Sequence, residues 1–267
     1  MLIVKVPALN GLGKTKGCEK APNAIIKALE DIWTNEEEKK IEKKQLDYEE
    51  IHVDNTNIEL SNKLIYKNAL ELFRQQDKVI FIGGDHSISF SLCKAFLDFC
   101  RNTKNNPGLI IFDAHPDCMP ASKQPTHEEW LRGLLEVGFP AKNILIIGIR
   151  AADEVELHYL KSKHINYYSC KELFTDIQQT CDGIMEAARK FSQLYISFDI
   201  DTIDPAFAPG TGYIEPAGLT SREFLYFFQR LLLLGNLKAA DIVEINPEKD
   251  INGITVKLGT KILAELL

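Results

Sequence analysis

The amino-acid sequence predicts an α/β fold, a three-layer α/β/α sandwich with a mostly parallel eight-stranded sheet. Eight short apolar runs rich in Val and Ile recur along the 267 residues, and several of them are apolar on both faces. Helical stretches separate most of these runs, which is typical of parallel strands joined by right-handed crossovers. No Pro/Gly/Ser-rich linker divides the chain, so residues 1–267 are expected to form a single domain.

The strands are expected where the apolar runs occur. Strands covered by helices on both sides need apolar side chains on both faces, and runs such as VIFIGG and LIIFDAH satisfy that requirement. The eight runs lie near residues 2–7, 45–53, 79–84, 109–115, 144–150, 165–170, 194–201 and 239–246.

Helices are expected between these strands. Helical stretches begin near Ala21, Asn57 and Ser87, and the last one runs from about Ile254 nearly to Leu267. Another begins at Thr220, which has Glu223 three residues later, the spacing of a capping box. This alternation of strand and helix is what a doubly wound sheet requires.

Charge and cysteine content exclude some classes of function. The formal net charge is -7 and no long basic run occurs, so neither nucleic acid nor an anionic membrane is an expected partner. The first residues lack the form of a secretory signal, and no apolar run reaches 18 residues. The six cysteines are scattered without a CxxC pair, which favours free thiols in a reducing cytoplasm.

Three clusters of polar residues follow predicted strands. They are GGDHS at 83–87, DAHPD at 113–117, and Asp199 and Asp201 with Asp204 behind them. Irregular segments rich in proline, at 118–125 and 204–218, follow two of these clusters. Ligands of parallel sheets bind at the carboxyl ends of the strands, on the loops that begin there. The clusters are therefore expected to meet in one site.

The residue types in these clusters favour metal binding. Side chains at i and i+2 of an extended strand point the same way, so Asp113 with His115, and Asp199 with Asp201, are expected to project together. Carboxylates packed so closely resist ionisation together unless a cation lies between them. Oxygen ligands with a few imidazoles suit Mn²⁺ or a similar divalent metal, and two metals about 3.5–4 Å apart are a common solution in hydrolases.

Each cluster also has an ordinary structural interpretation. His86 after two glycines could be a polar residue at the start of a helix, and Asp199 and Asp201 could cap the following loop. DAHPD is the stronger signal by itself. The occurrence of all three clusters at predicted strand ends favours one shared metal site.

Together the clusters resemble motifs of the arginase family of ureohydrolases, which includes arginase, agmatinase, formiminoglutamase and guanidinobutyrase. The similar segments occur in order over nearly the whole chain. They are GKTKGCEKAP at 13–22, GGDHS at 83–87, DAHPD at 113–117, SFDIDTIDPAFAPGTG at 197–212 and VEINP at 243–247.

The resemblance implies an arginase-like fold and two Mn²⁺ ions per subunit, with Ni, Co or Fe as other possible metals. One ion would be bound by His86, Asp113, Asp117 and Asp199, and the other by Asp113, His115, Asp199 and Asp201. A bridging water would attack the guanidinium carbon of a substrate and release urea. Family membership also implies a homo-oligomer, a trimer or hexamer.

Further catalytic and substrate-binding residues are implied by the same resemblance. Asp117 would accept the proton of the water, and Glu244 would pair with the guanidinium of the substrate. His127 resembles the family's proton-transferring histidine, although HG is usual in the family where this chain has His127-Glu128. The other reading of His127 is that it opens a helix. His52, His158 and His164 lie outside the motifs and are expected to be surface or structural residues.

Arginine is the first expectation for the substrate, and agmatine, guanidinobutyrate and formiminoglutamate are the alternatives. Asp153 falls where arginases place an acid that binds the substrate's α-amino group. Cys118 and Met119 stand where arginases carry an asparagine, and APGTGYIEPAG is more like agmatinase, with Tyr213-Ile214 unlike either. Two other classes remain open: a non-catalytic, metal-binding regulatory member of the family, and a two-metal phosphoesterase.

Overall fold

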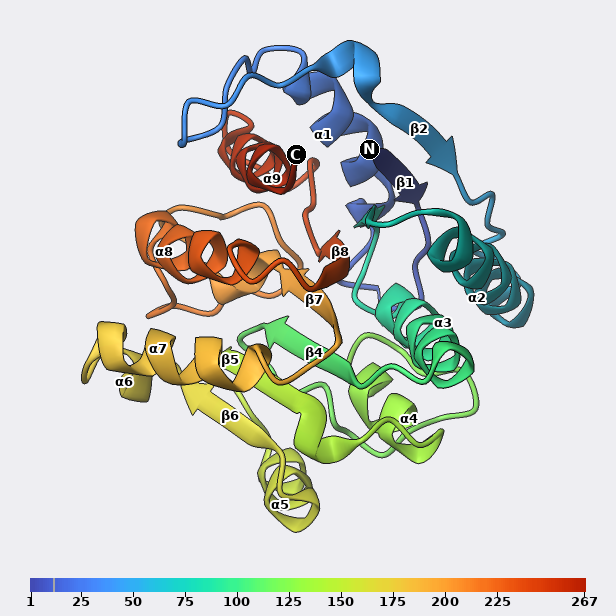
Figure 1. Ribbon diagram of the computed structural model, residues 1–267, viewed down its shortest axis with the longest axis vertical. Coiled ribbons are helices and arrows are strands. Elements are labelled where there is room, and N and C mark those ends of the chain that lie inside the picture. Colours follow the sequence, from blue (N-terminus) through green and yellow to red (C-terminus); the bar gives the residue numbers. More distant parts are fainter. Residues whose placement is uncertain (12) are drawn as a thin grey trace.

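The chain forms an eight-stranded sheet in which every strand pairing is parallel (Figure 1). The computed structural model describes residues 1–11 and 13–267. Each predicted strand is present, and the predicted α/β fold is confirmed. The strands are β1 (Leu2–Val6), β2 (Asp47–Glu50), β3 (Val79–Gly83), β4 (Pro107–Phe112), β5 (Ile144–Ile149), β6 (Asn166–Ser169), β7 (Gln193–Asp199) and β8 (Leu237–Val243).

The order of the strands across the sheet is β2-β1-β3-β8-β7-β4-β5-β6. The last two strands in the sequence, β7 and β8, therefore lie in the middle of the sheet, between β3 and β4. The four central strands thus combine two consecutive pairs, β3 with β4 and β7 with β8, that are far apart in the sequence. All four run in the same direction, so their carboxyl ends lie along one edge of the sheet.

Helices cover both faces of the sheet, on its left and its right in Figure 1. One face carries α1, α7, α8 and α9, and the other carries α2, α3, α4 and α5. The helices are α1 (Ala21–Leu29), α2 (Ile58–Gln75), α3 (Ile88–Thr103), α4 (Trp130–Glu136), α5 (Glu154–Lys163), α6 (Cys170–Leu173), α7 (Ile177–Ala188), α8 (Ser221–Leu232) and α9 (Ile254–Leu266).

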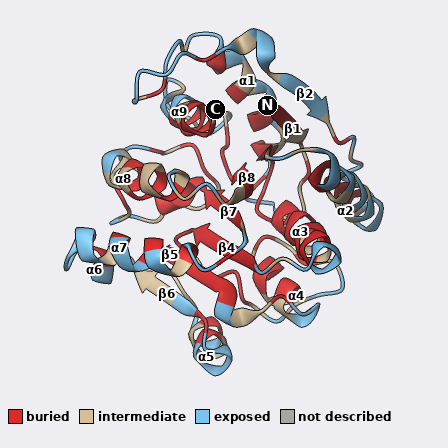
Figure 2. Ribbon diagram, in the orientation of Figure 1, coloured by how far each residue is buried: buried red, intermediate tan, exposed pale blue. Residues whose placement is uncertain are grey.

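Two hydrophobic cores separate these three layers, because the side chains of each strand alternate between the faces. In β3, Ile80 and Ile82 belong to the core under α1, α8 and α9, whereas Val79 and Phe81 belong to the core under α2 and α3. Figure 2 shows the central strands β4, β7 and β8 and the inner sides of the helices as buried, whereas the edge strand β2 is exposed and the edge strand β6 is largely intermediate. Burial of each large apolar side chain stabilises the fold by about 1.5–3 kcal/mol.

Local hydrogen bonds fix where helices begin. Thr220 accepts the backbone N–H of Glu223, and the Glu223 carboxylate accepts the N–H of Thr220, so the predicted capping box is confirmed. Asn57 caps α2 by accepting the N–H of Leu60. These caps satisfy backbone donors that the first turn of a helix leaves without partners.

The six cysteines are all buried free thiols. Within residues 1–11 and 13–267, no helix has the length and apolar character needed to cross a membrane.

Candidate metal centre and substrate pocket

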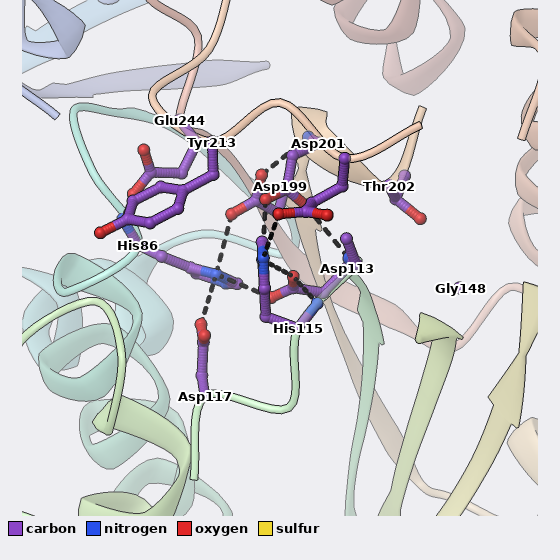
Figure 3. A network of polar contacts seen from close by, with 12 residues as sticks. His86, Asp113, His115, Asp117, Gly148, Asp199, Asp201, Thr202, Tyr213 and Glu244 are labelled. Atoms are coloured by element: carbon purple, nitrogen blue, oxygen red, sulfur yellow. Dashed lines mark hydrogen bonds and ion pairs between the residues drawn. The ribbon is translucent and has the colours of Figure 1, made fainter. Parts of the chain in front are cut away.

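Six side chains converge at the carboxyl edge of the central strands (Figure 3). His86 follows β3, and Asp113, His115 and Asp117 lie in the loop after β4. Asp199 is the last residue of β7, and Asp201 lies in the short 3₁₀ helix after it. The convergence expected from the sequence is therefore observed. The six residues are His86, Asp113, His115, Asp117, Asp199 and Asp201.

His86 points its Nδ1 atom at three carboxylates. That atom lies 3.1 Å from Asp113 Oδ2, 3.0 Å from Asp117 Oδ2 and 3.1 Å from Asp199 Oδ2. The loop that carries His86 packs closely against the segment after β1. Gly84 makes this packing possible, because a Cβ atom there would stand 2.1 Å from the carbonyl oxygen of Ala8.

A chain of hydrogen bonds orients the His86 ring from behind. Its Nε2 atom lies 3.0 Å from Ser197 Oγ, and Ser197 donates its hydroxyl proton to Asp241 Oδ1 over 2.7 Å. Tyr195 and Ser89 donate to Oδ2 of the same buried carboxylate. Because Ser197 gives its proton to Asp241, its oxygen accepts from His86 Nε2–H, so Nδ1 is the ring nitrogen that faces the carboxylates.

His115 makes the second set of close contacts. Its Nδ1 atom lies 3.0 Å from Asp201 Oδ2 and 3.5 Å from Asp113 Oδ1. Strand alternation does not explain this arrangement, since β4 ends at Phe112, before both Asp113 and His115. Instead, Asp113 Oδ1 accepts the backbone N–H of His115, and Asp199 Oδ1 accepts that of Asp201. Two similar turns therefore bring each pair together.

Two groups of side chains have ligand atoms close enough to hold a metal ion. One is His86, Asp113 and Asp199, the other is Asp113, His115 and Asp201, and within each group the ligand atoms lie within 4.8 Å of one another. Asp113 belongs to both. Nδ1 of His86 and Oδ2 of Asp113 are buried and lie 3.1 Å apart, but the contact lacks the geometry of a hydrogen bond and neither atom has another partner. Such atoms are costly to bury, and coordination of a divalent cation would remove that cost.

The electrostatics of the cluster also favour bound cations. Burial, then the charge of Asp113, raises the pKa of Asp117 to about 7. Burial and the charges of Asp201 and Asp113 raise the pKa of Asp199 well above its ordinary value. Without cations, Asp117 and Asp199 therefore resist ionisation, whereas the neighbouring imidazoles of His115 and His86 lower the pKa of Asp113. Carboxylate and imidazole ligands suit Mn²⁺ and related metals.

Asp117 is held by the beginning of α4. Trp130 donates its indole N–H to Asp117 Oδ2 over 2.7 Å, and the backbone N–H of Leu131 donates to the Asp117 carbonyl oxygen. Asp117 has a φ of 50°, a left-handed conformation that is rare for residues other than glycine. This conformation turns the chain after DAHPD so that Asp117 rejoins the cluster.

Glu244 lies beside His86 of the His/Asp cluster and is buried rather than facing solvent. It follows β8 with a φ of 63°, and its carboxylate Oε1 accepts the backbone N–H of His86 over 2.9 Å. Its other oxygen lies 3.8 Å from Cys18 Sγ. Burial, then the charge of Asp85, raises the pKa of Glu244 well above its ordinary value.

A pocket of about 410 Å³ adjoins the His/Asp cluster, and His115 and Asp117 are part of its wall. Acidic side chains dominate its wall, and among the described residues that line it Lys14 carries the one permanent positive charge. Asp153 lines the pocket and also caps α5 by accepting the N–H of Val155. The lining residues are Lys14, His115, Asp117, Met119, His127, Glu128, Ala151, Ala152, Asp153, Glu156, Tyr213 and Glu215.

His127 is buried in the wall of this pocket, outside a helix, because α4 begins only at Trp130. Its Nε2 atom lies 3.0 Å from the hydroxyl of Tyr213, and the two rings are in contact, with centroids 5.4 Å apart. Burial lowers the pKa of His127. The ring of His115 also contacts Tyr213, in an edge-to-face arrangement with 5.7 Å between the ring centroids. His52, His158 and His164 are exposed, as expected.

Several residues of the site received no role from the sequence. Trp130, Lys14 and Glu128 carried no signal beyond their position near a motif. Tyr213 lies in the irregular segment 204–218, whose proline and glycine content did mark it as a ligand-binding loop. The carboxylate of Glu156, which accepts the backbone N–H of Cys118, was also missed.

The arginase family model matches residues 1–267. Among curated proteins, arginase 1 (mitochondrial) of Oryza sativa is 30% identical over 190 residues, which are 70% of this chain and 54% of the relative. The arginase of Plasmodium berghei is 33% identical, over 71% of this chain and 58% of the relative. The chain thus spans little more than half the length of these relatives.

Solved structures with this fold include several activities. The formimidoylglutamase of Bacillus subtilis has a TM-score of 0.89 at 25% identity, covering 99% of this chain and 84% of that one. The agmatine ureohydrolase of Thermoplasma volcanium has a TM-score of 0.85 at 25% identity, covering 99% of this chain and 87% of that one.

Proposed function

The chain belongs to the arginase family, and we propose that it is a metal-dependent hydrolase that cleaves a C–N bond of a linear guanidino compound and releases urea. The observation that carries this proposal is the pair of His/Asp groups that share Asp113, next to an acidic pocket that His115 and Asp117 line. Relatives named arginase and agmatine ureohydrolase support a guanidino substrate.

Two Mn²⁺ ions are the proposed cofactor, and Ni, Co or Fe are other candidates. The first would be held by His86, Asp113, Asp117 and Asp199, and the second by Asp113, His115, Asp199 and Asp201. The partnerless Nδ1 of His86 and Oδ2 of Asp113 support this assignment. When bound, the two cations supply Lewis acidity that makes a water molecule nucleophilic near neutral pH.

The side chains around the centre would carry out the remaining steps. Asp117, whose carboxylate is oriented by Trp130, would accept the proton released when water attacks the guanidinium carbon. Glu244 would pair with the guanidinium, whose N–H groups match a carboxylate. Asp117 would then pass this proton to the leaving amine, with His127 assisting the proton transfer, so that the C–N bond breaks and urea departs.

Arginine remains the first choice of substrate. Its tail carries an ammonium and a carboxylate, and the pocket wall offers an acid for the first, Asp153, and a cation for the second, Lys14. Agmatine is the second choice, because the acids Glu128, Glu156 and Glu215 outnumber the single lysine and favour a purely cationic ligand. Guanidinobutyrate and formiminoglutamate carry carboxylates and less positive charge, so the acidic wall favours them less.

A substrate panel tests this proposal. Purified protein loaded with Mn²⁺ is incubated with arginine, agmatine, guanidinobutyrate and guanidine, and urea is measured. We expect urea from arginine or agmatine and a much lower rate from the others. If no member of the panel yields urea, the guanidino proposal fails. Formamide from formiminoglutamate would then indicate the related activity, hydrolysis of a phosphoester would indicate a phosphoesterase, and metal binding without turnover would indicate a regulatory protein.

We also propose a cellular compartment and an assembly for the enzyme. The six free, buried thiols support the proposed location in a reducing cytoplasm. A homo-oligomer, as a trimer or hexamer, is proposed from family membership, and arginine or polyamine metabolism follows from the proposed substrates.

A further inference from the structure

Tyr213 joins the buried His127 to the partly exposed Glu128. Its hydroxyl oxygen lies 3.0 Å from His127 Nε2 and donates to Glu128 Oε1 over 3.2 Å. The His127 side chain is 6% exposed, whereas that of Glu128 is 38% exposed. The phenol therefore bridges a histidine inside the wall of the pocket and a carboxylate at its outer edge.

The His127–Tyr213 contact alone fits either tautomer of the histidine, but both hydrogen bonds of the phenol can form at once in only one arrangement of protons. An ionised carboxylate can only accept, so the single hydroxyl proton of Tyr213 points to Glu128. The phenolic oxygen is then an acceptor toward His127, and Nε2 must carry the proton that fills this bond. Burial and the neighbouring Glu128 raise the pKa of Tyr213 to about 12, so the phenol keeps its proton at neutral pH.

The other ring nitrogen of His127 has no partner. Nδ1 is buried and makes no hydrogen bond. A buried N–H without an acceptor would be costly, whereas Nδ1 without a proton offers a lone pair. The orphaned atom thus agrees with the tautomer that the Tyr213 hydroxyl selects.

Hydrogen bonds of Arg150 connect the segment that carries Tyr213 to the turn that carries Asp201. The Arg150 guanidinium donates to the carbonyl oxygens of Glu215 and Asp201, each over 2.6 Å, and so ties the tyrosine segment to the turn that holds Asp201. Lys14 lies over the outer face of the phenol ring, with its Nζ 4.4 Å from the ring centroid. The phenol is therefore held in place by protein contacts before any substrate enters.

We propose that Tyr213 and Glu128 are positioning residues that hold His127 as its Nε2–H tautomer, with the Nδ1 lone pair free to take up a proton during catalysis. This inference rests on the proposed function, because it assigns His127 a part in proton transfer. Neither Tyr213 nor Glu128 needs to touch the reacting atoms. Their effect is to keep one nitrogen of His127 occupied and the other available.

Nitrogen NMR of histidine-labelled protein tests the tautomer directly. The protein is loaded with Zn²⁺, which is diamagnetic, and the His127 signals are assigned by comparison with His127→Asn. We expect a protonated Nε2 and an unprotonated Nδ1 in the wild-type protein. Tyr213→Phe keeps the ring but removes the acceptor, and Glu128→Ala frees the phenolic proton to point at Nε2. Both variants should show a mixture of tautomers.

Two matched variants separate positioning from simple loss of packing. Glu128→Gln keeps an acceptor oxygen and should retain the wild-type tautomer. Tyr66→Phe removes another tyrosine–carboxylate hydrogen bond, that from Tyr66 to Asp98 between α2 and α3, and should leave His127 and turnover unchanged. In the Mn²⁺-loaded protein, Tyr213→Phe and Glu128→Ala should lower kcat by roughly 10-fold to 100-fold, a part of what acid–base catalysis contributes. KM should stay within about twofold in Tyr213→Phe, which keeps every charge of the pocket wall.

The outcomes distinguish this inference from the proposed function. A protonated Nδ1 in the wild-type protein, or an unmixed Nε2–H tautomer in either variant, overturns the positioning role. Unchanged kcat in both variants, with urea released normally, overturns it as well. If the wild-type protein shows the expected tautomer but releases no urea from any substrate, the proposed function fails and the orientation of His127 stands.

Discussion

Trp130 donates its indole N–H to Asp117 Oδ2 over 2.7 Å, and the same oxygen lies 3.0 Å from Nδ1 of His86. The indole ring also packs on the imidazole of His86, with 4.7 Å between ring centroids. One side chain at the start of α4 therefore orients two of the proposed metal ligands. Groups that orient metal ligands in this way typically change metal affinity when removed.

Trp130→Phe should accordingly weaken metal binding while leaving the fold intact. The ring that packs on His86 is kept in large part, but Asp117 loses the donor that fixes it. We expect Mn²⁺ affinity to fall by about 10-fold to 100-fold, measured by calorimetric titration against a competing chelator. Trp33→Phe is the control, because Trp33 is 72% exposed and distant from the centre. Equal affinities of both variants and the wild type would show that Trp130 only fills space.

His86→Ala and Asp201→Ala should each reduce bound metal and activity together. The two residues belong to different groups around the shared Asp113, so each variant should hold fewer than two ions per chain. Elemental analysis after gel filtration measures the metal, and urea release measures activity. The exposed His52→Ala is the control. A variant that keeps two ions and full turnover would remove that residue from the site.

Glu244→Gln should separate substrate binding from metal binding. The amide oxygen of glutamine can still accept the backbone N–H of His86, so the loop and the metal content should be preserved. The charge that pairs with a guanidinium is lost, however, and kcat/KM should fall by at least about 10²-fold. The exposed Glu248→Gln serves as control. Wild-type kcat/KM in Glu244→Gln would reject the guanidinium role.

Much of the fold followed from the sequence, because the relevant signals are local. Covered parallel strands need continuous apolar runs, and β3, β4 and β5 follow that pattern, whereas the edge strands β2 (DYEE) and β6 (NYYS) are more polar and less buried. Helices α4, α5, α6 and α7 were not placed, and α5 and α6 are short and only partly apolar. The central position of β7 and β8 depends on pairings between distant segments, which no local pattern specifies.

The site divides in the same way. The six proposed ligands and Glu244 were identified because they stand in motifs at strand ends, and the structure brings them together. Trp130, Tyr213 and Lys14 reach the site by contacts across the fold, so their positions could not be inferred from spacing. The metal-binding and catalytic roles, the extent of the domain, the oligomeric state and the compartment stay predictions.

Glu36 gives a prediction of pH-dependent stability away from the site. Arg222, together with Lys261 and Gln229, lowers its pKa from 4.5 to about 2 and links the segment after α1 to α8 and α9. A lowered folded-state pKa adds stability above pH 4.5, and this stability disappears as pH falls toward 2. Glu36→Gln should lower the free energy of unfolding by about 0.5–1 kcal/mol at neutral pH, since the pairs are largely exposed.

Urea denaturation of the wild type and Glu36→Gln at a series of acidic pH values checks this expectation. The difference between the two proteins should shrink steadily as the solution becomes more acidic. A difference that stays constant with pH would mean that packing, and not the charge of Glu36, makes the contribution.

Anomalous X-ray diffraction from crystals grown with Mn²⁺ tests the central claim most directly, because it locates metal without reference to activity. The account predicts two anomalous peaks per chain, about 3.5–4 Å apart, with Asp113 in contact with both ions. Data without a peak between His86, Asp113 and Asp199, or with the ions bound elsewhere on the chain, would contradict it.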